Sequence, residues 1–129
     1  MLIRATLAVV ATLVAWGGTA SAQTYNVVSG NAVRLINAIS ANPDCTSTGR
    51  AVVRVTQPPQ HGRITIRSAA MFPRFEPSNP RSICNTRRVP GVEAVYVSER
   101  GYVGSDSAAF EAIFPNGEYR TGSSNITVR

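Results

Sequence analysis

The sequence contains no lysine and very little histidine or cysteine, and these shortages exclude several kinds of site. Its 129 residues include one histidine and two cysteines. His61 lies in a proline-rich turn, and Cys45 and Cys84 are far apart, which makes a poor set of zinc ligands and no C-x-x-C redox motif. No serine lies in a G-x-S-x-G context. We therefore expect no catalytic residue, no metal site and no cofactor, and we interpret the protein as a non-enzyme.

Long apolar runs are also scarce, because only residues 5–16 form one, and this run is too short for a membrane helix of ~20 residues. Arg4 precedes the run, and residues 20–22 follow it with the small-x-small pattern of a cleavage site. We predict a signal peptide over residues 1–22 and a mature domain over residues 23–129 with no transmembrane segment. The alternative is an uncleaved N-terminal anchor. Export predicts a periplasmic or secreted location.

The two cysteines fit an oxidising compartment, where disulfides form and persist. Cys45 and Cys84 are the only pair available, so they predict a single structural disulfide. On the chain-entropy model, closing a loop of this length stabilises a domain by roughly 4 kcal/mol. Such a bridge is a large contribution for one small domain.

The charge of the chain is positive, with a formal net charge of +6, and every one of its thirteen basic residues is arginine. Arginine binds phosphate and carboxylate groups with two parallel hydrogen bonds, so an anionic envelope component or an acidic protein surface is one expected partner. The alternative, which we prefer, is a bias toward arginine codons combined with ordinary solubility, since the arginines are scattered and only Arg87-Arg88 is a doublet. We expect no nucleic-acid partner, because no binding motif of that kind is present.

Alternating apolar residues and regularly spaced turns predict an all-β protein. We expect strands over residues 24–28, 50–56, 63–67, 92–97 and 107–114. Residues 118–120 and 124–128 are expected to make the closing strand, for which a kink at Gly122 is possible. Residues 32–39 mix strand and helix periodicity, so either a strand or a short helix is possible. The segment between residues 56 and 63 contains Pro58 and Pro59, and we expect it to join its two flanking strands as a hairpin.

Residues 71–89 are the least regular part of the mature chain, with three prolines and two phenylalanines. A connection of this length is unusual unless it is ordered or functional. We predict an ordered excursion that Cys84 ties back to Cys45. Phe72 and Phe75 are expected to cover the edge of the core, and a ligand platform is the other interpretation.

Two turn-and-strand motifs carry a resemblance to a known family. The matching residues are Pro59, Gly62, Tyr96, Tyr102, Gly104, Asp106, Gly117, Ile126, Thr127 and Val128. In order and spacing, residues 50–129 resemble the Ig-like and cadherin-like domains of bacterial exported proteins. The resemblance implies an Ig-like β-sandwich of about seven strands. Ser98 and Ala108 depart from the pattern, which often has proline and phenylalanine there.

The same resemblance implies structural roles for three turn residues. Gly62 and Gly104 allow tight turns, and Asp106 accepts backbone N–H groups across its turn. Cadherin-like domains also suggest calcium, but seven acidic residues spread along the chain are too few for the six to eight oxygens that calcium requires. We therefore expect a structural role for Asp106 rather than a metal site.

Together these observations favour an exported, non-catalytic binding module that contacts a protein or an anionic envelope component. The candidate binding patch is Arg81, Arg87 and Arg88 with Phe72 and Phe75. The alternative is a small secreted inhibitor or accessory protein of a hydrolase, whose excursion enters a cleft of its partner.

Overall fold

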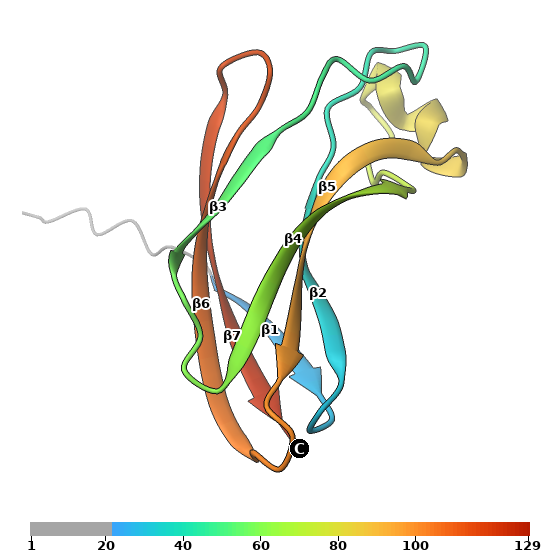
Figure 1. The fold of residues 1–129 in the computed structure, drawn as a ribbon. Helices are drawn as coiled ribbons and strands as arrows, with labels where there is room; N and C mark the ends of the chain where they lie inside the picture. Colours follow the sequence, from blue (N-terminus) through green and yellow to red (C-terminus); the bar gives the residue numbers. More distant parts are fainter. Residues whose placement is uncertain (1–21) are drawn as a thin grey trace, which may run out of the picture.

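The computed structural model describes residues 22–129, which form two facing β-sheets (Figure 1). The predicted signal peptide lies outside the described residues, except for Ala22. One sheet has the order β1-β7-β6-β3 and the other has the order β2-β5-β4. The elements are β1 (Gln23–Val27), β2 (Ala32–Ala38), β3 (Val52–Gln57), β4 (Gly62–Met71), η1 (Pro80–Thr86), β5 (Val89–Ser98), β6 (Gly104–Ile113) and β7 (Tyr119–Val128). The predicted all-β sandwich of seven strands is confirmed.

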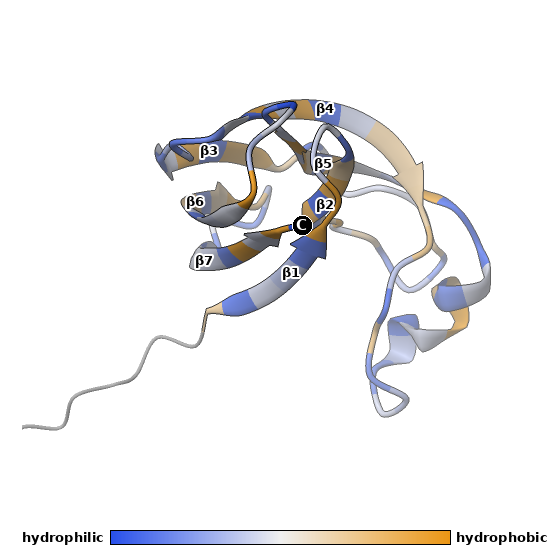
Figure 2. Ribbon diagram, turned by 90° about the horizontal axis from the view of Figure 1, so that it is seen from below, coloured by the Kyte–Doolittle hydropathy of each residue, from blue (hydrophilic) through white to orange (hydrophobic). Residues whose placement is uncertain are grey.

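The strand periodicity follows from burial on one face of each sheet. In the centre of the second sheet, Val92, Ala94 and Tyr96 of β5 point into the core, and Phe110 of β6 and Ile126 of β7 meet them from the first sheet. Figure 2 shows apolar and polar segments alternating along the strands of both sheets. The core therefore lies between the sheets.

Two expectations about the strands are resolved by pairing. Residues 32–38 form a strand, and its pairing with β5 shifts between Arg34 and Ile36, so a bulge explains the mixed periodicity. The predicted hairpin between residues 50–56 and 63–67 is wrong, because β3 pairs with β6 and β4 pairs with β5 in the opposite sheet. Prolines cannot donate to a strand ladder, and the segment that carries them crosses from one sheet to the other.

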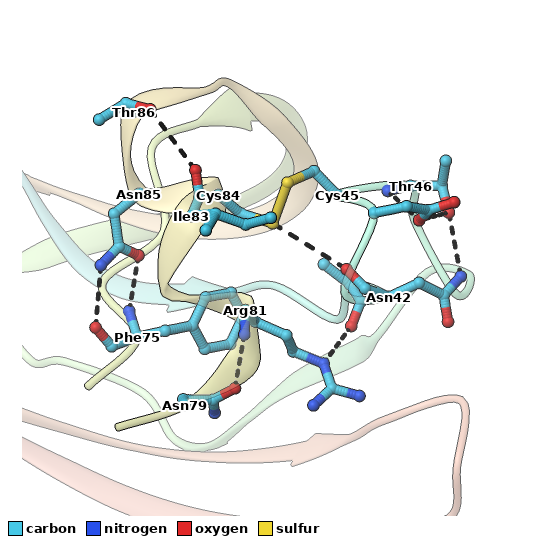
Figure 3. Close-up of a disulfide and its surroundings, with 12 residues drawn as sticks. Asn42, Cys45, Thr46, Phe75, Asn79, Arg81, Ile83, Cys84, Asn85 and Thr86 are labelled. Atoms are coloured by element: carbon cyan, nitrogen blue, oxygen red, sulfur yellow. Dashed lines mark hydrogen bonds between the residues drawn. A yellow bond between two sulfur atoms is a disulfide. The ribbon is translucent and has the colours of Figure 1, made fainter. Parts of the chain in front are cut away.

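The excursion after β4 packs as a small second cluster. Cys84, Ala41 and Val89 are buried in it, and Phe75 packs against them. The disulfide Cys45–Cys84 joins the excursion to the loop after β2, with the two Cα atoms 5.4 Å apart (Figure 3). The predicted disulfide is confirmed.

Side-chain hydrogen bonds hold the excursion in place. The Asn85 amide accepts from the Phe75 N–H at 2.8 Å and donates to the Phe75 carbonyl at 2.9 Å (Figure 3). Arg81 donates from Nε to the carbonyl of Ala41 at 2.6 Å, and Asn79 caps η1 by accepting from the Arg81 N–H at 2.9 Å.

Within residues 22–129, no helix is long and apolar enough to cross a membrane.

Candidate binding surfaces

The five residues of the predicted binding patch differ in exposure and in their contacts. Arg81 and Phe75 take part in the internal bonding and packing of the excursion. Phe72 is 50% exposed, and the Arg88 guanidinium lies over its ring, 5.3 Å from the centroid. Arg87 is exposed at the end of η1. Phe72, Arg87 and Arg88 are therefore exposed, whereas Phe75 and Arg81 make structural contacts within the excursion.

Phe72, Phe75 and Arg81 also line a cleft of about 1880 Å³, which the sequence did not reveal. The cleft is open to solvent, and its lining comes from the excursion on one side and from the hairpin of β6 and β7 on the other. Other aromatic residues that line it are Tyr25, Phe110 and Phe114. Arg87 and Arg88 do not belong to this lining.

The lining of the cleft is positively charged. It includes four arginines and two glutamates, namely Arg34, Arg74, Arg81, Arg120, Glu76 and Glu118. Arg120 donates from Nε to Glu118 at 2.8 Å, and its guanidinium lies 5.2 Å from the Phe114 ring centroid. Arg74 is exposed and makes no ion pair or side-chain hydrogen bond with any residue in the range 22–129. The cleft thus offers a guanidinium for an anionic group.

A second charged cluster lies on the outer face of the sheet β2-β5-β4. Glu93 in the central strand is only 2% exposed, and it lies 2.5 Å from Arg34 Nε of β2 and 2.7 Å from Arg67 Nε of β4. The hydrogen bond from Arg67, helped by Arg34, lowers the pKa of Glu93 against the opposing effect of burial. Glu93 is buried although it lies on the outer face, because its cross-strand neighbours Arg34 and Arg67 cover the carboxylate.

Asp106 lies near the start of β6, and four hydrogen-bond donors of the protein surround its carboxylate. It accepts from the backbone N–H groups of Gln60 (2.9 Å), His61 (3.0 Å) and Ser107 (2.9 Å), and from the Tyr96 hydroxyl (2.8 Å). Burial raises the pKa of Asp106, but these hydrogen bonds outweigh it and the net shift is downward. The pKa of Tyr96 is raised, mainly by burial and to a smaller extent by its hydrogen bond to Asp106.

The two predicted turn glycines lie beside this network. A Cβ atom at Gly62 would lie 2.7 Å from the Val97 carbonyl oxygen and closer still to the Tyr96 ring. Gly104 has a φ of +144°, which favours glycine. The ring of Tyr102 stacks on His61 with the centroids 3.8 Å apart, and its hydroxyl donates to the Ser105 carbonyl at 2.6 Å. His61 is thus packed into the turn structure at this end of the sandwich.

Among residues 22–129, no group of three or more His, Cys, Asp or Glu side chains is placed to hold a metal ion.

Comparison with known proteins assigns no family. No family model matches the chain, and no curated protein matches it. One solved structure that matches is "Solution Structure of Amebosin", with a TM-score of 0.41 and 12% identity over 82% of this chain and 88% of that chain. The resemblance to bacterial Ig-like and cadherin-like domains therefore stays a prediction.

Proposed function

We propose that the protein is an exported, non-catalytic binding module that acts in the periplasm or outside the cell. Its partner is a protein or an anionic envelope component, contacted through the cleft and the adjoining exposed group Phe72, Arg87 and Arg88. The observation that carries the proposal is the open, arginine-lined and aromatic-lined cleft between the excursion and the β6–β7 hairpin.

The physical properties of this region support a binding role. Aromatic residues and arginine are the types enriched at protein interfaces. The excursion is held by a disulfide, by the Asn85 amide and by Arg81, so little chain entropy is lost when a partner docks on it. Arg74, Arg87 and Arg88 are exposed and available to an anionic partner.

The proposal is tested by capture of partners from an envelope extract. The full chain is expressed in an exporting host, and the intact mass of the exported protein shows whether it begins at Gln23. Immobilised protein is exposed to extract at low and moderate salt, and bound material is identified by mass spectrometry. We expect Arg74→Glu, which changes the cleft, to reduce the captured material at least tenfold, and Arg87→Glu with Arg88→Glu to reduce it further.

The matched control is Arg63→Glu, which should leave capture unchanged, because Arg63 is exposed on β4, lies outside the cleft lining and makes no ion pair with any residue in the range 22–129. A partner released by modest salt would be an anionic polymer or lipid, and one that survives it would be a protein. Capture that is equal for all variants, or absent from wild type, contradicts the proposal.

One observation favours the alternative of a hydrolase inhibitor. Ile83 is 63% exposed on η1, directly beside the buried, disulfide-bonded Cys84, so an apolar side chain projects from a fixed segment. An inhibitor should suppress one enzyme in a panel of peptidases and glycosidases at a one-to-one ratio. We expect Ile83→Asp to abolish that inhibition, whereas Val103→Asp, at a residue that is 68% exposed in the turn between β5 and β6, should not. No inhibition across the panel would dismiss this alternative.

A further inference from the structure

The strand β7 is only partly covered on one of its edges. Its residues pair with β6 along the whole strand, from Tyr119 to Val128. On its other edge, β1 pairs in parallel with β7 from Ser124 to Val128 only. Within residues 22–129, residues 119–123 of β7 therefore have no strand beside them on that edge, as the short β1 in Figure 1 illustrates.

The hydrogen-bond phase of the hairpin shows which backbone groups face this open edge. Phe114 donates its N–H to the Glu118 carbonyl at 2.9 Å, so these two residues form a hydrogen-bonded pair. In an antiparallel ladder, such pairs alternate with pairs whose backbone groups point outward. Arg120 and Gly122 thus bond to β6, and the N–H and C=O groups of Tyr119, Thr121 and Ser123 point away from it.

This open edge forms one wall of the cleft. Residues 120–124 of β7 line the cleft, and residues 34–37 of β2 line it from the other sheet. Among residues 22–129, β2 is itself an edge strand, since it pairs with β5 alone. Phe114 and Tyr25 are partly exposed, lie in the same lining and provide apolar contacts. An extended segment lying in the cleft would therefore meet unpaired backbone groups on one side and aromatic rings along it.

The edge also lacks the features that normally block strand addition. Protected edges carry proline, lysine or inward-pointing charges. Residues 119–123 contain no proline, and their one charge, Arg120, is paired with Glu118. Five residues of strand span about 17 Å, which is enough for a short peptide.

We infer that the cleft takes an extended, acidic peptide segment of a partner protein, which adds to the β7 edge as a new strand beside residues 119–123. This rests on the proposed binding function and names its partner class. Backbone bonding to Tyr119, Thr121 and Ser123 supplies the pairing. The excess of arginine in the lining, with Arg74 exposed and outside any ion pair among residues 22–129, favours carboxylate side chains in the peptide.

The test uses a displayed library of random nonapeptides selected on the exported protein. Selected peptides should be rich in Asp, Glu and β-branched residues and poor in Pro and Lys. Their affinity is measured by fluorescence anisotropy. Thr121→Pro removes an outward N–H and leaves the bonds to β6 in place, so it should weaken binding by ~10-fold or more, equivalent to about 1.4 kcal/mol. Thr121→Ala keeps the N–H and should bind as wild type does.

A second measurement keeps the inference testable if Thr121→Pro does not fold. Amide hydrogen exchange of Thr121 and Ser123 in the wild-type protein should slow at least tenfold when a selected peptide binds. Unchanged exchange there, equal binding by the proline variant, or a peptide set without acidic enrichment would each overturn the inference. Self-association of the protein that Thr121→Pro abolishes would also overturn it, because a second copy would then occupy the edge.

The outcome of the capture experiment separates the two proposals. If envelope capture depends on Arg74 but peptides give no protection of the β7 edge, only the strand-addition inference fails. If neither capture nor peptide binding is seen, the proposed binding function fails as well.

Discussion

Asp106→Ala is expected to lower the free energy of unfolding by about 3 kcal/mol. The carboxylate accepts three backbone N–H groups and the Tyr96 hydroxyl, and the side chain is only 8% exposed. Its removal leaves these donors without a partner at a buried position, where each lost bond to a charged acceptor is costly. Urea titration followed by circular dichroism measures the loss.

Tyr96→Phe serves as the matched control. It removes one donor from the network and leaves the three backbone donors on Asp106, so we expect a loss of about 1 kcal/mol. Equal stability of Asp106→Ala and wild type would show that water replaces the carboxylate without cost. It would also contradict the structural role that we assign to Asp106.

The same network makes stability depend on pH in a defined direction. Because the folded-state pKa of Asp106 is lowered, its contribution is present above the unfolded-state pKa of about 3.9 and is lost as the pH falls through the folded value. Glu93, whose pKa is also lowered, acts in the same direction. The urea concentration at the unfolding midpoint of the wild type should therefore decrease as the pH is lowered below about 4. In Asp106→Asn this decrease with falling pH should be less steep.

Loss of the disulfide is expected to cost about 4 kcal/mol, because the bridge closes a loop of about 40 residues in the unfolded chain. Cys45 and Cys84 are separated by 39 positions, and Cys84 is fully buried against Ala41 and Val89. The double variant Cys45→Ala with Cys84→Ala is preferable to serine, since a serine hydroxyl at position 84 would be buried. The unfolding free energy of this variant and of oxidised wild type gives the difference.

The site where proteolysis begins distinguishes a local effect of removing the disulfide from a general loss of stability. The excursion should become the first site of proteolysis in the double variant, whereas β5, β6 and β7 should stay protected, because they have partners on both sides over much of their length. Cleavage at the same sites in variant and wild type would show that the hydrogen bonds of Asn85 and Arg81 hold the excursion without the bridge.

The strand positions could be predicted largely from the sequence because burial on one face leaves a period of two. The alternation at Ala108, Phe110 and Ala112 is visible in the sequence and matches the buried face of β6. Residues 32–38 could not be assigned with the same rule, because the bulge after Arg34 interrupts the alternation. The ends of β4 and β5 extended further than expected, because their pairing with each other continues to Met71 and Val89.

The candidate surfaces were less predictable. Phe72, Phe75 and Arg81 were named from the composition of the excursion, and they do line the cleft, but the cleft itself is formed with the β6–β7 hairpin, which is remote in sequence. Glu93 gave no sign of burial, because the residues that cover it, Arg34 and Arg67, belong to the two neighbouring strands. Cross-strand neighbours depend on the pairing register, and the sequence of one strand alone does not determine that register.

The sequence by itself determined the all-β class, the places of most strands and the disulfide, because these depend on local periodicity, turn residues and a single possible cysteine pair. Only the tertiary structure decided which strands are neighbours. It placed β3 beside β6, set β1 parallel to β7, and left part of the β7 edge uncovered among residues 22–129. The physical reason is that strand pairing joins segments far apart in the chain through backbone groups that every residue carries, so side-chain patterns do not identify the partner.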